Sequence, residues 1–277
     1  MRLGGQLFGD LRDPEKWARA VRDAGFRAAI CPVGADAGEA EVKSFMEVAV
    51  KHDIAISEVG AWSNPISPDA QVREAALAHS KRQLAIAETV GARCCVNIAG
   101  SRGEQWDGPH PDNFSDETFE RIVDTVREII DEVQPKRTFF ALETMPWIFP
   151  DSADTYLALL RAIDRPMFGV HLDPVNMISS PRVYYRNGEM IRDFFAKLGP
   201  HIRNCHAKDI RLAGQLTVRL EEVVPGRGAL DYRTFLRELS KLDPDTPLII
   251  EHLQNAEECA EGAAYIRQVA NEIGVAL

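Results

Sequence analysis

The sequence has few cysteines and no long apolar run. Its five cysteines, Cys31, Cys94, Cys95, Cys205 and Cys259, are odd in number and include an adjacent pair, which argues against a disulfide framework in a chain of 277 residues. No stretch approaches the roughly 20 consecutive apolar residues that a membrane-spanning helix needs, and the N-terminus lacks the basic-then-apolar run of a signal peptide. We therefore expect a soluble cytoplasmic protein with buried thiols and no membrane partner.

Basic residues are in the minority as well. The chain carries 32 Lys and Arg against 42 Asp and Glu, a formal net charge of −10, which disfavours binding to the phosphate backbone of a nucleic acid. Low-complexity linkers are also missing, and 277 residues with 45% hydrophobic content can bury one large core but leave little for a second. These features predict a single domain over residues 1–277 without a nucleic-acid partner.

Short apolar or β-branched runs alternate along the chain with longer segments of helical periodicity. This alternation predicts parallel strands connected by helices, and eight such repeats favour a (β/α)8 barrel of the α/β class. The expected strands cover residues 2–8, 26–33, 54–62, 93–100, 138–145, 168–175, 202–209 and 247–253.

Several residues mark where the helices between these strands begin and end. Asp13 and Asp231 each precede a helical segment, in the position of an N-cap that accepts a hydrogen bond from the first turn. Gly25, Gly91 and Gly199 each follow a helical segment, where a left-handed residue commonly ends a helix. We expect left-handed C-caps at all three glycines.

Two connections are longer than barrel closure requires, residues 101–115 and 210–230. Both follow strand C-termini, the face on which barrel enzymes place their active sites, so both are candidates to close over a ligand. They are alternatively ordinary surface excursions. Trp106, His110 and Arg227 favour the functional interpretation, because such side chains are unusual choices for loops without a role.

Each of the last four expected strands carries an acidic or imidazole residue near its C-terminal end: Glu143, Asp173, His206 and Glu251. Each follows an apolar run, where an isolated charge is costly to bury, so a shared cation would neutralise the set. Any one of them alone fits a strand-end salt bridge, but the ordered series favours a single divalent metal site on the active face. Three carboxylates and one imidazole suit Mn²⁺ best, with Mg²⁺, Co²⁺ or Zn²⁺ as alternatives.

With this ligand series the chain resembles the xylose-isomerase-like barrels, which include sugar phosphate isomerases and epimerases, ketose 3-epimerases, inosose-processing enzymes and, more distantly, endonuclease IV. The resemblance covers essentially the whole chain and is most specific in the Glu, Asp, His, Glu series and in PGRGALDYRTFLREL at 225–239. It implies that Glu143, Asp173, His206 and Glu251 are metal ligands. It also implies that Glu143 and Glu251 handle the substrate proton, as the two glutamates do in the epimerases.

Two positions depart from the pattern of ketose 3-epimerases. Asn176 stands where those enzymes usually carry a histidine, and Phe149 stands where they carry a further glutamate. The segments EQWDGPHPDN (104–113), ETMPWIFPDS (143–152) and HLDPVNM (171–177) look more like the α subunits of C-glycoside deglycosidases, which cleave 3-oxo-glycosides by elimination. A small second subunit would accompany that activity, and a homo-oligomer is the other expected assembly.

Epimerisation or isomerisation and elimination all begin by removing a proton from a carbon next to a carbonyl. A metal bound to the carbonyl oxygen and the adjacent hydroxyl oxygen stabilises the resulting enediolate. Reprotonation gives epimerisation or isomerisation, whereas loss of a β-substituent gives elimination. We expect a sugar isomerase or epimerase acting on a keto-sugar or inosose, with the lyase as the alternative. An abasic-site endonuclease is disfavoured by the seven histidines and the negative charge. A noncatalytic barrel would not require four converging ligands.

Further side chains are candidates for substrate contact or proton transfer. Lys208 follows His206 by two residues on one strand, so both should face the same side, and its ammonium is expected to bind a hydroxyl or enediolate oxygen. His110, between two prolines, is a candidate acid or base bordering the cavity, with an exposed loop histidine as the alternative. The expected substrate-binding residues are Trp147, Asn97, Asn176, Trp106 and Arg227, although a tryptophan at a strand end is as often a packing residue.

Three more residues near these strand ends receive no role in the expected chemistry. His171 and His252 neighbour expected ligands, and we interpret both as structural residues that point to the opposite face. Glu58, near the end of the third expected strand, fits either a structural role or a place in the site.

Overall fold

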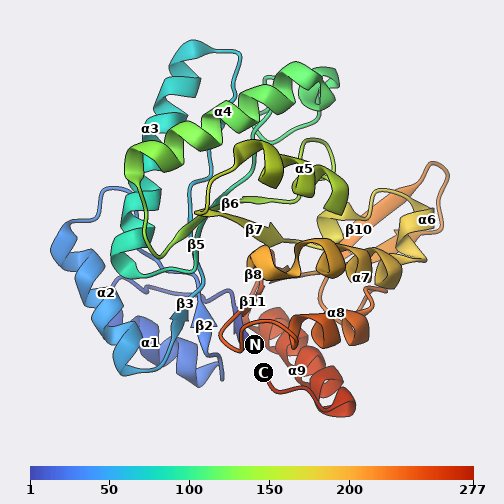
Figure 1. Ribbon diagram of the computed structural model, residues 1–277. Coiled ribbons are helices and arrows are strands. Elements are labelled where there is room, and N and C mark those ends of the chain that lie inside the picture. Colours follow the sequence, from blue (N-terminus) through green and yellow to red (C-terminus); the bar gives the residue numbers. More distant parts are fainter.

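The computed structural model describes residues 1–277 as a barrel of parallel strands with helices packed around its outside (Figure 1). Neighbouring strands follow the order β3-β2-β1-β11-β8-β7-β6-β5-β4. β3 (Ala55–Ile56) and β4 (Glu58–Gly60) are one stretch of chain interrupted at Ser57, and they pair with β2 on one side and β5 on the other. The ring therefore closes through residues 55–60, which confirms the predicted (β/α)8 architecture.

The remaining strands of the barrel all begin within the expected ranges, and all of them end earlier than expected. Glu251 and His252, for example, were expected inside a strand but lie beyond the end of the last one. The reason is that the chain leaves the ladder at this face to form the site, and the φ of +60° at His252 ends the extended conformation. These strands are β1 (Arg2–Gly5), β2 (Ala28–Ala29), β5 (Cys94–Asn97), β6 (Phe139–Glu143), β7 (Phe168–Leu172), β8 (Ile202–Ala207) and β11 (Pro247–Ile250).

The helices connect the strands on the outside of the barrel (Figure 1). Asp13 accepts a hydrogen bond from the backbone N–H of Lys16, and Asp231 accepts one from that of Thr234, as the N-cap prediction requires. The helices are α1 (Pro14–Asp23), α2 (Glu39–Lys51), α3 (Ala70–Val90), α4 (Asp116–Val133), α5 (Ala153–Ile163), α6 (Pro181–Tyr184), α7 (Asn187–Leu198), α8 (Tyr232–Leu239) and α9 (Ala256–Ile273), with 3-10 turns η1 (Pro111–Phe114), η2 (Val175–Met177) and η3 (Gly199–His201). None of the helices is both long and apolar enough to cross a membrane.

The expected left-handed helix ends are confirmed at two of the three glycines. Gly25 has a φ of +69° and Gly91 a φ of +79°. The prediction for Gly199 is wrong, because its φ is −44° and the chain continues into the 3-10 turn η3. Pro200 fits that turn because the first residues of a helical segment need no N–H donor.

The connection 210–230, expected as a loop, contains an antiparallel hairpin made of β9 (Asp209–Ala213) and β10 (Arg219–Val223). The hairpin extends away from the barrel (Figure 1). Asp209 then fixes the glycine-rich turn that follows, accepting hydrogen bonds from the N–H groups of Gly226 at 2.9 Å and Gly228 at 3.0 Å. A Cβ on Gly228 would lie 2.3 Å from the Asp209 carboxylate, so only glycine allows this approach.

Tyr156 of α5 connects the outer helices to two of the strands that carry the site. Its buried hydroxyl lies 2.6 Å from the carbonyl oxygen of Leu142 in β6 and 3.0 Å from that of Gly169 in β7. It also accepts a hydrogen bond from the backbone N–H of His171 at 3.2 Å. The hydroxyl thereby stabilises the junction of β6 and β7 without touching the side chains at the strand ends.

Candidate metal centre

The four strand-end residues of the sequence analysis come from four strands that are neighbours in the barrel, in the order β11-β8-β7-β6. Glu143 ends β6, Asp173 follows β7, His206 lies in β8 and Glu251 follows β11. Because parallel strands present their C-termini on one face, the four side chains converge, and one ligand atom from each lies within 4.8 Å of the others. The structure therefore brings together all four predicted ligands.

The imidazole of His206 lies among the three carboxylates. Its Nδ1 is 2.8 Å from Glu251 Oε1, 3.3 Å from Glu143 Oε1 and 4.0 Å from Asp173 Oδ2. Asp173 and His206 are fully buried, and the other two are almost so. Three negative charges removed from water in this way require compensation by positive charge.

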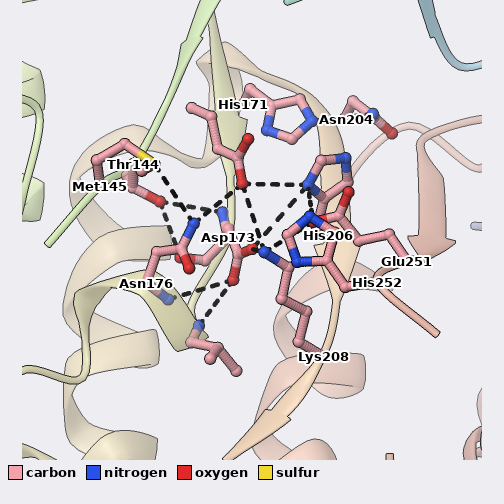
Figure 2. A network of polar contacts seen from close by, with 12 residues as sticks. Thr144, Met145, His171, Asp173, Asn176, Asn204, His206, Lys208, Glu251 and His252 are labelled. Carbon is pink, nitrogen blue, oxygen red and sulfur yellow. Dashed lines mark hydrogen bonds and ion pairs between the residues drawn. The ribbon is translucent and has the colours of Figure 1, made fainter. Parts of the chain in front are cut away.

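Lys208 supplies part of that compensation. Its Nζ lies 2.8 Å from Asp173 Oδ2, 2.8 Å from Glu251 Oε1 and 3.8 Å from Glu143 Oε1. Figure 2 shows the ammonium directed among the acidic side chains. Burial would lower the pKa of Lys208, but attraction to Asp173 and Glu251 outweighs burial and raises the pKa well above its usual value. In the metal-free protein Lys208 is therefore a cation at neutral pH.

The pKa values of two ligand residues respond to the same charges. Burial would lower the pKa of His206, but attraction to Glu251, Glu58 and Glu143 raises it well above the usual value. Burial would raise the pKa of Glu251, but attraction to His206 and Lys208 lowers it far below the usual range. In the metal-free protein the imidazole therefore carries a proton at neutral pH, while Glu251 is ionised.

The donor atoms fit a divalent cation. Asp173 Oδ2 and Glu251 Oε1 are buried and accept no aligned hydrogen bond, although Lys208 Nζ lies 2.8 Å from each. Buried oxygens without hydrogen-bond partners are rare, and a metal ion would satisfy both. Carboxylate oxygens and one imidazole nitrogen suit Mg²⁺, Mn²⁺, Co²⁺ or Zn²⁺. The cluster could therefore hold such an ion.

Neighbouring groups fix the orientation of two ligand carboxylates. Asn176, in the turn after β7, donates a hydrogen bond from Nδ2 to Glu143 Oε1 at 3.0 Å. Its backbone N–H, at 3.3 Å, and that of Val175, at 2.9 Å, donate to Asp173 Oδ1. Asn176 was expected to contact substrate, and the structure places it against the ligand Glu143. Figure 2 shows Asn176 beside Asp173.

The expected orientation of His171 and His252 is wrong. His171 precedes Asp173 by two residues, a spacing that puts both side chains on one side of a strand, and it faces the barrel interior 3.1 Å from Glu58 Oε2. His252 adjoins Glu251 but lies past the end of β11, where strand alternation no longer applies. Its Nε2 is 3.7 Å from Glu251 Oε1, and its Nδ1 is 3.2 Å from Glu222 Oε2.

The structure places three of the expected substrate residues around the face rather than in the ligand cluster. Trp147 follows β6, its side chain is partly exposed, and its indole Nε1 is buried without a hydrogen-bond partner. Asn97 is buried at the end of β5, where its Oδ1 accepts hydrogen bonds from the N–H groups of Ser63 and Ile98. Trp106 lies in the loop 101–115 with 38% of its surface exposed.

His110 and Arg227 are not brought to the cluster. His110 is the N-cap of η1, and its Nδ1 accepts a hydrogen bond from the backbone N–H of Asp112 at 3.3 Å. Arg227 forms a paired contact with Glu261 of α9, with nitrogen–oxygen distances of 2.8 Å and 2.6 Å. The glycine-rich turn directs Arg227 toward this acidic helix, which sequence spacing could not indicate. Its expected substrate contact is therefore not supported by this structure.

Two acidic residues of the site were missed or left open by the sequence analysis. Glu222 of β10 lies 3.9 Å from Lys208 Nζ and was missed because its segment was interpreted as a loop. Glu58 of β4 is 1% exposed, and a glutamate within the apolar run IAISEVG was the available signal. Burial would raise the pKa of Glu58, but attraction to His206 and hydrogen bonds from His171 and His206 lower it to about 2.

Comparisons with solved structures find the same fold in proteins with different described activities. A xylose isomerase-like TIM barrel protein from Mycobacterium smegmatis in complex with magnesium aligns with a TM-score of 0.70 and 19% identity, over 98% of this chain and 97% of that one. The 3-keto-D-glucoside 4-epimerase of E. coli aligns with a TM-score of 0.70 and 13% identity, over 97% and 99%. Endonuclease IV from Thermus thermophilus aligns with a TM-score of 0.73 and 16% identity, over 98% and 100%.

At these identities the structural neighbours establish the fold and not the reaction. No curated protein matches the sequence. A family model described as the xylose isomerase-like TIM barrel matches residues 18–269, nearly the whole chain, and agrees with the closed ring of strands and the ligand series. The chain belongs to the xylose isomerase-like TIM barrel family.

Proposed function

We propose that this protein isomerises or epimerises a keto-sugar or inosose with one bound divalent cation, Mn²⁺ being the preferred ion. The proposed ligands are Glu143, Asp173, His206 and Glu251. The observation that carries the proposal is the convergence of three buried carboxylates and one imidazole on the C-terminal face of the barrel. Mg²⁺, Co²⁺ and Zn²⁺ fit the same donors. The magnesium in one structural neighbour and the epimerase activity in the name of another support this choice.

The two glutamates are the proposed proton-transfer groups. They come from β6 and β11, the outer two of the four neighbouring strands, so their carboxylates approach a bound substrate from different sides. When bound, the ion would supply Lewis acidity to a substrate carbonyl and the hydroxyl beside it. One glutamate removes the proton from the carbon next to that carbonyl, and the other returns a proton to the opposite face.

Lys208 and Trp147 complete the proposed substrate site. The Lys208 ammonium sits 2.8 Å from Asp173 and Glu251, where it offsets negative charge that develops on a substrate oxygen. The Trp147 side chain is partly exposed after β6, and its indole face suits a sugar ring. Trp106 and His110, both in the loop 101–115, remain proposed substrate contacts. Asn97 at the end of β5 is a third proposed contact.

A lyase that cleaves 3-oxo-glycosides by elimination is the second candidate. Phe149, which replaces a glutamate of ketose 3-epimerases, packs edge-to-face against Phe114 and Phe119 at ring-centroid distances of 5.4 Å and 5.5 Å. That position is therefore apolar packing and not a polar substrate contact, which favours a substrate other than a free ketose. The proposed partner is then a small second subunit, and otherwise a second copy of this chain.

The first prediction concerns metal content. The purified protein should bind about one divalent ion per chain, and His206→Ala should lose most of it because the variant lacks the only nitrogen ligand. Elemental analysis after gel filtration measures the ratio. His201→Ala is the matched control, since His201 is exposed at the opposite end of β8. Equal metal content in wild type and His206→Ala would remove His206 from the site.

The second prediction concerns the pH dependence of metal binding. Because the pKa of His206 is raised in the metal-free protein, its imidazole must release a proton before Nδ1 can bind a cation. Metal affinity should therefore rise as pH increases, by about tenfold per pH unit while His206 remains protonated. Calorimetric titration with Mn²⁺ in buffers of different ionisation enthalpy should detect about one proton released per ion at pH 7. Binding without proton release would contradict the charge state assigned to His206.

The third prediction concerns the substrate proton. On the substrate found by screening free ketoses against 3-oxo-glycosides with Mn²⁺, the reaction in D₂O should place deuterium on the carbon next to the carbonyl. Glu251→Gln, shown to retain its metal, should lose about 100-fold or more in kcat. An α-deuterated substrate covers the case of a proton that never exchanges with solvent. No primary isotope effect, together with a near wild-type rate for the metal-loaded variant, would exclude this mechanism.

A further inference from the structure

Glu58 is a buried carboxylate outside the four-residue ligand set. It lies on β4, whereas the three side chains that contact it lie across the barrel on β7 and β8. Its Oε2 is 3.1 Å from His171 Nε2 and 3.3 Å from His206 Nε2, and it also accepts a hydrogen bond from Asn204 Nδ2. Figure 2 shows His171 and Asn204 beside His206. An ionised side chain in this position is costly without such partners.

His206 therefore lies between two groups of acidic side chains. Its Nδ1 faces Glu143 and Glu251, while its Nε2 faces Glu58. A neutral imidazole has one N–H donor and one nitrogen lone pair, and the partner of one nitrogen decides which tautomer is present. In the metal-free protein the carboxylates on both sides keep a hydrogen on each nitrogen. When a metal ion takes the place of the hydrogen on Nδ1, the carboxylate of Glu58 accepts a hydrogen bond from the hydrogen that stays on Nε2.

We propose that Glu58 is a positioning residue that holds His206 in the Nε2–H tautomer, with Nδ1 aimed at the metal, an inference that rests on the metal site proposed above. Glu58 also fixes the plane of the His206 ring, because the Glu58 carboxylate is itself held by His171 of β7 and Asn204 of β8. Carboxylates that accept a hydrogen bond from a metal-binding histidine raise its basicity and orient it. Their loss costs about 10–100-fold in metal affinity.

The test compares Glu58→Gln with Tyr156→Phe. Glu58→Gln keeps the size of the side chain but removes its charge and adds an amide donor that can pair with the wrong tautomer of His206. Tyr156→Phe removes a buried hydroxyl that contacts only backbone groups, so it lowers stability without touching His206. We expect the Kd for Mn²⁺, measured by calorimetry on folded protein, to rise about 10–100-fold in Glu58→Gln and to stay within about twofold in Tyr156→Phe.

A second measurement needs no variant of Glu58. Nitrogen-15 NMR of histidine-labelled wild type loaded with Mg²⁺ distinguishes the two tautomers, and the His206 signals are assigned from the spectrum of His206→Ala. The hydrogen is expected on Nε2 with Nδ1 unprotonated. A hydrogen on Nδ1 in the loaded protein would overturn the inference even if Glu58→Gln does not fold.

The outcomes distinguish failure of the proposed metal site from failure of the role of Glu58. Wild type that binds neither Mn²⁺ nor Mg²⁺ would remove the proposed function and this inference with it. If the wild type binds Mn²⁺ and a folded Glu58→Gln binds it with an unchanged Kd, the role of Glu58 alone is overturned. An equal rise in Kd in Glu58→Gln and Tyr156→Phe would also overturn that role, because the loss of affinity would then come from lower protein stability and not from the orientation of His206.

Discussion

The arrangement of the site depends on the balance of buried charge at the C-terminal face of the barrel. Glu143, Asp173 and Glu251 place three carboxylates within a few ångströms, and Lys208 and His206 lie among them with compensating charge. Carboxylates removed from water destabilise a fold unless they are paired. A divalent ion completes this balance. The same balance explains why the pKa of Lys208 and that of His206 are both raised despite burial.

The barrel provides the geometry that this charge balance needs. Four strands that are neighbours in the ring deliver one ligand each, and the chain leaves the ladder directly after Ile250 so that Glu251 can turn inward. The four ligand residues form one polar layer, and a second polar layer lies against it, where Glu58 contacts His171 and His206 across the barrel. His206 belongs to both layers, since each ring nitrogen faces a different group of carboxylates. The orientation of this one ring therefore couples the barrel interior to the candidate metal site.

Sequence patterns predicted those parts of the fold and site that follow from strand order and alternation. The convergence of Glu143 and Glu251 follows from their places at the ends of parallel strands, and the position of Lys208 follows from its two-residue spacing from His206. The same spacing was not applied to His171, which was therefore placed on the wrong side. The contact of Arg227 with Glu261 depends on tertiary packing, which no local pattern encodes.

If one cation joins these four side chains, it will be visible in a crystal of the protein soaked in Mn²⁺, with diffraction data collected at an energy where manganese scatters anomalously. We expect one strong anomalous peak bonded to Glu143, Asp173, Glu251 and the Nδ1 atom of His206, at about 2.0–2.3 Å. A fully soaked crystal with no peak between these residues, or with a peak held by other side chains, would show that the four residues do not form a metal site.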